Sequence, residues 1–99
     1  SLSPQVEYED TRGEEEQYRS FLYLTTAPDG VLFAVGTYGS DDDGEQDEEI
    51  VAFDAATLTV RKRFGRGLWG DLGACGMVVV GDELYVGDPS NRCIRVGST

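Results

Sequence analysis

The chain is expected to be all-β, and three features of the sequence support this prediction. Short apolar or alternating runs recur along its 99 residues. Turn-forming pairs such as Asp29-Gly30 and Gly81-Asp82 separate these runs. No stretch of about ten or more residues has the periodicity of an amphipathic helix. A chain of this length can bury a core of its own, so residues 1–99 are expected to form a single domain.

The N-terminal region contains one candidate strand and a charged linker. In Gln5–Glu9, Val6 and Tyr8 alternate with polar residues, which predicts a short strand with one apolar face. Residues 10–19 are mostly charged or polar, and a linker is expected there. The alternative is that all of residues 1–20 form a disordered terminus.

Four strands are predicted in the first half of the chain. They are Ser20–Thr26, Val31–Gly36, Ile50–Phe53 and Leu58–Phe64. The first is rich in aromatic and β-branched residues, the second is almost continuously apolar, and the last alternates apolar with basic residues as a partly exposed strand does. The acidic stretch Ser40–Glu49 separates the second strand from the third and is predicted to be a solvated loop.

Three more strands are predicted near the C-terminus. They are Met77–Val80, Leu84–Val86 and Cys93–Val96. The glycine-rich segment Gly65–Cys75 connects them to the first half, and Asp88–Asn91 forms a turn before the last strand. The chain therefore contains one group of four strands and one group of three.

The two groups are related as an internal repeat. Aligning Gly36 with Gly87 superimposes two similar apolar strands at an offset of 51 residues, and aligning Phe53 with Val96 gives an offset of 43. The difference of eight residues falls on the acidic stretch Ser40–Glu49, so the first copy contains an insertion there. Repeats of about 40–50 residues with four strands each are typical of β-propeller blades.

The second copy also resembles a known repeat. Leu84–Val96 reads Leu-Tyr-Val-Gly-Asp-Pro-Ser-Asn-Arg-Cys-Ile-Arg-Val. This is similar to NHL-type β-propeller repeats, whose pattern is Leu-Tyr-Val-x-Asp-x-x-Asn-x-Arg-Ile-x-Val. The chain has Arg92-Cys93 where that family often has His-Arg, and it contains no histidine. The resemblance covers the second copy well and residues 21–64 in outline, and it implies a propeller to which this chain contributes about two blades.

In this interpretation the second blade, residues 76–96, lacks a fourth strand, whereas the first blade, residues 20–64, is complete. We expect Gln5–Glu9 to supply the missing strand, because propeller families close by pairing one terminus with the blade that the other began. Two blades alone would leave two apolar faces in water. Three chains forming a six-bladed propeller are therefore expected. The alternatives are that further blades belong to a longer parent chain, or that the chain is a small two-sheet sandwich.

A propeller would gather several loops of this chain around one mouth, where a protein or a small molecule could bind. The residues expected to line it are Arg66, Trp69, Asp71, Asp88, Asn91 and Arg92. A tryptophan in a glycine-rich loop can anchor a partner, or it can pack between blades. Asp88 and Asn91 are also residue types that bond their own backbone in turns, and Arg92 could pair with Asp88.

The acidic stretch supplies candidates for a metal site. An alignment with the EF-hand loop puts Asp41 and Asp43 at ligand positions, but Gly39 and Ile50 then occupy the first and twelfth positions, where carboxylates are required. The motif therefore fails. Asp41, Asp43 and Asp47 are only weak candidates for binding calcium, and no other cofactor is expected.

The composition narrows the functional classes. Nineteen acidic and eight basic residues give a net charge of −11. Nucleic acids and anionic membranes are disfavoured as partners, because Lys and Arg supply most of the affinity for their phosphates. Without histidine, a Ser-His-Asp triad and a Cys-His dyad are excluded. We therefore expect a non-enzymatic binding module. The alternatives are a lactonase-like propeller hydrolase with a carboxylate-bound calcium, and a propeller fragment without a native ligand.

The two cysteines, Cys75 and Cys93, are too few to form a disulfide framework. They are expected to be semi-buried thiols, since a free cysteine packs as a small apolar residue. Adjacent strands could instead bring them together as one disulfide.

Overall fold

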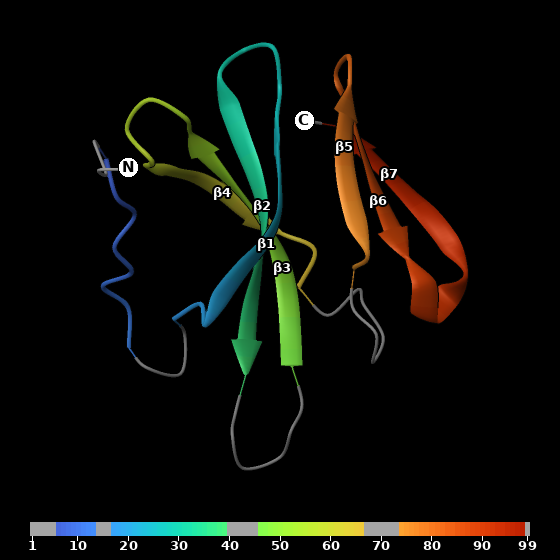
Figure 1. Cartoon of the computed structure of the whole chain (residues 1–99), viewed down its shortest axis with the longest axis horizontal. Helices are drawn as coiled ribbons and strands as arrows, with labels where there is room; N and C mark the ends of the chain where they lie inside the picture. The colour runs from blue at the N-terminus through green and yellow to red at the C-terminus, as the bar shows by residue number, and fades with distance from the viewer. Residues whose placement is uncertain (1–5, 14–16, 40–45, 67–73, 99) are drawn as a thin grey trace, which may run out of the picture.

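The computed structural model describes residues 6–13, 17–39, 46–66 and 74–98, which contain two antiparallel β-sheets (Figure 1). The strand order is β1-β2-β3-β4 in the first sheet and β5-β6-β7 in the second. The bounds are β1 Ser20–Thr26, β2 Val31–Gly39, β3 Gln46–Asp54, β4 Val60–Phe64, β5 Gly76–Val80, β6 Glu83–Asp88 and β7 Cys93–Ser98, with a 3-10 helix at Pro89–Asn91. The all-β prediction is confirmed. In the described part of the chain, no helix is long and apolar enough to cross a bilayer.

The acidic residues at the start of β3 do not form the loop predicted for them. Ser40–Glu49 is predicted to be a solvated loop, but residues 46–49 belong to β3, and this part of the prediction is wrong. Glu48 and Glu49 are buried. Their burial is tolerated because both carboxylates accept hydrogen bonds, Glu48 from the Ala74 amide at 2.9 Å and Glu49 from tyrosine hydroxyls.

The N-terminal segment also differs from the prediction. Residues 6–9 form no strand, and the second sheet has three strands rather than four in the part of the chain that the structure describes. Tyr8 instead packs on the first sheet, where its ring centroid lies 5.6 Å from that of Phe21 and 5.1 Å from that of Phe53. Burying one aromatic ring among two others favours this position over an edge strand with only two apolar side chains. Gln5 lies outside the described residues.

Apolar side chains cover both faces of the first sheet, as the alternation of side chains along β2 requires. Its inner face packs on the second sheet through a cluster made chiefly of Val31, Phe33, Val35, Ile50, Ala52, Leu84 and Val86. Its outer face carries a second cluster made of Ala34, Val51 and Phe53, on which Tyr8 and Tyr18 pack. The N-terminal segment therefore lies on the first sheet opposite the second sheet (Figure 1).

The strand register corrects the repeat alignment. In the first sheet Leu32 pairs with Phe53. Offsets of 51 and 43 would carry this pair to Glu83 and Val96, but Glu83 pairs with Ser98. The offsets of 51 and 43 therefore cannot both be right, because paired residues in one copy must correspond to paired residues in the other.

Offsets of 52 and 44 preserve the pairing. They carry the pair Val31 and Asp54 to the pair Glu83 and Ser98. They also superimpose residues of the same kind, namely Leu32 on Leu84, Phe33 on Tyr85 and Ile50 on Ile94. The insertion in the first copy still amounts to eight residues, so the repeat itself stands.

This alignment shows how the two copies pack. Phe33 and Ile50, on the inner face of the first sheet, correspond to Tyr85 and Ile94, which lie on the side of the second sheet that faces away from the first. The sheets are thus stacked head to tail, because equivalent faces of the two sheets point in the same direction. The equivalent strands β1 and β5 lie against each other (Figure 1). Such a heterologous contact leaves an unused face at each end of the pair.

Candidate interaction surface

The outer face of the second sheet is apolar and exposed. Val78, Val80, Ile94 and Val96 retain 51%, 60%, 69% and 54% of their accessible surface. Val78 lies opposite Tyr85, and Tyr85 lies opposite Val96, so these side chains project to the same side. Val80 and Ile94 share that side, since each lies two residues along its strand from one of them. We call these four residues the open face.

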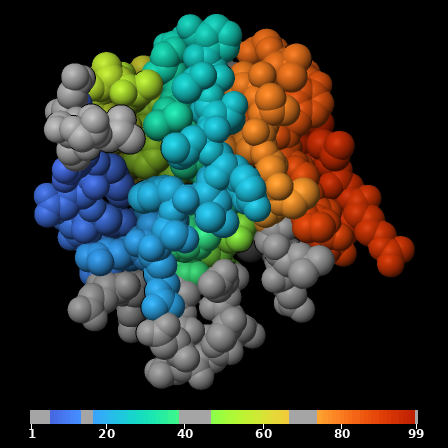
Figure 2. Space-filling view, in the orientation of Figure 1, coloured from blue at the N-terminus to red at the C-terminus, as the bar shows by residue number. Residues whose placement is uncertain are grey.

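The open face corresponds to the buried inner face of the first sheet. Ile94 and Val96 are equivalent to Ile50 and Ala52, which are 3% and 1% exposed. In Figure 2 the second sheet forms one flank of the molecule, in orange and red, and the N-terminal residues form the opposite flank in blue. A contiguous apolar surface of this kind marks an interaction site in soluble proteins.

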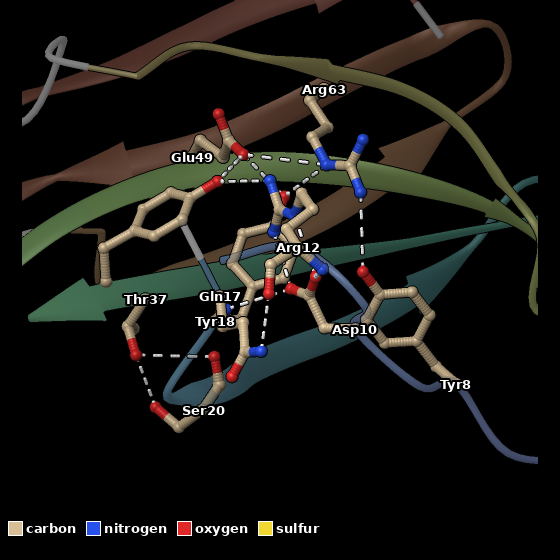
Figure 3. Close-up of polar contacts among 10 residues, drawn as sticks. Tyr8, Asp10, Arg12, Gln17, Tyr18, Ser20, Thr37, Glu49 and Arg63 are labelled. Carbon is tan, nitrogen blue, oxygen red and sulfur yellow. Dashed lines mark hydrogen bonds and ion pairs between the residues drawn. The ribbon is translucent and has the colours of Figure 1, made fainter. Parts of the chain in front are cut away.

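The opposite end of the stack is covered by the N-terminal strap, which we define as residues 6–13 and 17–19. Within it, Arg12 forms a two-point ion pair with Asp10, with Nε–Oδ1 and Nη2–Oδ2 distances of 2.8 and 2.7 Å (Figure 3). The Tyr18 amide also donates to Asp10 Oδ2 at 3.1 Å. These bonds, that of Arg12 first, hold the pKa of Asp10 well below its ordinary value of 3.8. The strap is therefore folded on itself by a partly buried charge pair.

Hydroxyl and guanidinium groups join the strap to the first sheet. The Tyr18 hydroxyl donates to Glu49 Oε1 at 2.5 Å and accepts a bond from Arg63 Nε at 3.1 Å. Arg12 Nη1 donates to the Tyr38 hydroxyl at 3.1 Å, and Tyr38 in turn donates to Glu49. Burial, followed by the bond to Glu49, raises the pKa of Tyr18. The hydroxyl, guanidinium and carboxylate groups named here bond to one another, so the arrangement positions the strap on the first sheet.

Gly36 allows the strap to approach the sheet closely. A Cβ atom at Gly36 would lie 2.4 Å from two carbons of the Tyr18 ring. The Tyr18 ring stacks further on Phe21 and Tyr38, with centroids at 5.1 and 4.9 Å. Glycine is required here because the ring occupies the space of a side chain.

Three of the predicted mouth residues lie together. Asp88 is 1% exposed, and its Oδ2 accepts bonds from Asn91 Nδ2 at 2.9 Å and from Arg95 Nε at 2.8 Å. These partners, Asn91 first, lower the pKa of Asp88. Arg95 is the cation that pairs with Asp88, in place of the Arg92 suggested by the sequence. Arg92 adopts a left-handed conformation, with φ 55°, at the end of the 3-10 helix.

A shallow open hollow lies beside this turn. Its lining residues are Cys75, Gly87, Asp88, Pro89, Arg92, Cys93 and Ile94. The other oxygen of Asp88, Oδ1, is buried and has no hydrogen-bond partner among the described residues. Both cysteines are free and exposed, so the predicted semi-burial of Cys75 and Cys93 is wrong. Among the described residues, no group of three or more acidic or cysteine side chains could hold a metal ion.

Arg66 lies at a different place from the Asp88 turn. Its guanidinium sits 4.1 Å from the centre of the Tyr38 ring, and its Nε is 3.5 Å from Asp47 Oδ2. Asp47, a weak metal candidate from the sequence, therefore has a basic partner. Trp69, Asp71, Asp41 and Asp43 lie outside the described residues.

Sequence reasoning did not find the strap. The signal that could have indicated it is the alternation of Tyr8, Asp10 and Arg12, whose side chains all reach the first sheet or each other. The sequence predicts only that two apolar blade faces are exposed to water. One of them is the open face, and the other is the outer face of the first sheet, which the strap covers.

Comparisons of the chain with protein-family models, with curated proteins and with solved structures found no match.

Proposed function

We propose that this chain is a non-enzymatic binding module that packs a further β-sheet on its open face. The observation that carries the proposal is the exposure of Val78, Val80, Ile94 and Val96. Two of them, Ile94 and Val96, correspond to Ile50 and Ala52, which pack on the second sheet. A third sheet of the same kind would fit there by repeating the contact that the chain already makes within itself.

In its fullest form, the proposal is a β-propeller of six sheets from three copies of the chain. Three observations support it: the repeat of a four-stranded sheet as a three-stranded sheet in the described residues, its likeness at Leu84–Val96 to NHL-type repeats, and the head-to-tail stacking of the two copies. Heterologous contacts between identical units close into a ring when the rotation allows. A protein or small ligand at the mouth would then meet the exposed Arg92 beside the hollow.

The test is the solution mass of the native chain, measured by sedimentation over a wide range of protein concentration. We expect species heavier than the chain mass of 10.8 kDa to form as the concentration rises, up to three times that mass. The variant Ile94→Asp should remain at the mass of one chain, because a charge on the open face cannot be buried against an apolar sheet. Assembly of the native chain that survives Ile94→Asp would refute the proposal.

A further inference from the structure

The N-terminal strap occupies the face that a neighbouring sheet would need. Ala34 lies on the outer face of the first sheet and corresponds to Val86, which is buried against the first sheet from the inner face of the second. Leu32 and Leu84 are related in the same way. The covered face is therefore built like the face that already binds a sheet within the chain.

We propose that the outer face of the first sheet is a docking surface for the open face of a second copy, and that the N-terminal strap closes this surface. The inference rests on the proposed function, because both use the open face. The two surfaces complement each other. The covered face is equivalent to the inner face of the second sheet, and the open face is equivalent to the inner face of the first sheet, and these two inner faces already pack together within the chain. Within one chain these surfaces point in opposite directions, so only another copy can join them.

The strap is held by contacts that can be released. Only two aromatic rings of the strap, Tyr8 and Tyr18, enter the outer cluster. Its side-chain bonds to the sheet run from Arg12 to Tyr38, from Tyr18 to Glu49, and from the Arg63 side chain to both strap hydroxyls. The Arg19 amide, at the end of the strap, also donates to the Thr37 carbonyl of β2 at 2.7 Å. No strand of the sheet pairs with residues 6–13 in the described structure. Residues 6–13 can thus leave without unpairing any strand, while Arg19 stays bonded to β2.

Gly36 provides a way to release the strap in the full-length chain. The variant Gly36→Ala places a Cβ where the Tyr18 ring lies, so the ring must move away. At offset 52 the residue equivalent to Gly36 is Asp88, which is larger and is buried in the second sheet. An alanine at position 36 is therefore compatible with a docked sheet. The double variant Tyr8→Ala with Tyr18→Ala releases the strap by a second route that leaves the backbone of β2 unchanged.

Two measurements are made on each variant. The rate of tryptic cleavage after Arg12 reports whether the strap is released. In the bound strap the Arg12 side chain is held by Asp10, so trypsin cannot bind it. Sedimentation reports the assembly. We expect both release variants to be cleaved faster than the native chain and to assemble at a concentration lower by about tenfold or more, because the apparent affinity scales with the fraction of chains whose docking surface is open.

Charge variants identify the docking surface. Gly36→Ala combined with Ile94→Asp should return to the mass of one chain. Gly36→Ala combined with Ala56→Asp should still assemble, because Ala56 is exposed in the turn between β3 and β4 and belongs to neither sheet face.

The outcomes separate the two proposals. If the release variants are cleaved quickly yet assemble no more readily than the native chain, the closure by the strap is wrong, and the proposed function stands as long as Ile94→Asp abolishes assembly of the native chain. Assembly that survives Ile94→Asp in the Gly36→Ala background overturns the docking surface. If neither the native chain nor a released chain exceeds the mass of one chain, both proposals fail.

Discussion

At the scale of single residues, the fold stabilises the charged forms of Asp10 and Asp88 and the neutral form of Tyr18. Asp10 is paired with Arg12, and Asp88 accepts bonds from Asn91 and Arg95. Their pKa values are lowered for that reason, whereas burial raises that of Tyr18. Proton uptake by the carboxylates or proton loss by the tyrosine therefore favours the unfolded chain.

The free energy of unfolding should be highest between the ordinary pKa values of 3.8 for aspartate and 10.0 for tyrosine. Groups with lowered folded pKa values stabilise the fold above pH 3.8 and lose that contribution as the pH falls further. Tyr18 contributes below pH 10.0 and loses its contribution as the pH rises beyond it. Urea titrations across pH should find this window. Asp10→Asn should flatten the acid limb, and an acid limb of unchanged slope in that variant would contradict the assignment.

Arg12→Ala should lower the free energy of unfolding by about 1–3 kcal/mol, because the variant removes charge-assisted bonds to a partly buried carboxylate. Arg12→Lys keeps the charge but not the two-point geometry, so it should recover only part of the loss. Urea unfolding of the three chains measures this. Equal stability of the lysine variant and the native chain would show that geometry is unimportant.

At the scale of the elements, alternation of side chains predicted the strands well. Among the described residues, seven strands overlap the runs that indicated them, although β3 begins at Gln46 in the acidic stretch. The runs were informative because each lies on a sheet with at least one buried face. The error in the repeat offsets arose because both were chosen from residue similarity alone. Residues that pair across β2 and β3 were not required to match residues that pair across β6 and β7. The strap could not be foreseen from local pattern, because Tyr8 is held by rings from β1 and β3 that are distant in the sequence.

The two faces of the β6–β7 hairpin should respond differently to truncation. Leu84→Ala should destabilise the fold by about 2–5 kcal/mol, since Leu84 is 2% exposed and its removal leaves a cavity between the sheets. Ile94→Ala, at a position 69% exposed, should change the stability by no more than about 0.5 kcal/mol in a dilute single chain. Urea unfolding at low protein concentration compares them. Similar losses for both would mean that the open face is buried.

At the scale of the whole molecule, charge opposes the contact that the open face favours. Each chain carries a net charge of −11, so two copies repel each other over distances comparable with the Debye length. Residue type alone could not predict which of the proposed mouth residues lie together. Arg66 lies apart from the Asp88 turn, because the positions of the loops depend on how the sheets stack.

Assembly of the native chain should therefore strengthen as sodium chloride is added, because the salt screens the repulsion while leaving apolar burial intact. Sedimentation at low and high salt measures the change. An assembly that weakens with salt would point to attraction between charged side chains instead of contact through the open face.

The strap also makes the two ends of the stack unequal, and this has a consequence for growth. A chain whose strap is bound can attach its open face to a released chain, but it offers no docking surface for the next copy. It would thus act as a chain stopper. Mixing native chains into a solution of the Gly36→Ala variant should lower the fraction of closed three-chain assemblies as the native fraction rises, which mass measurements can follow. The N-terminal residues would then control the closure of the ring as well as the onset of assembly.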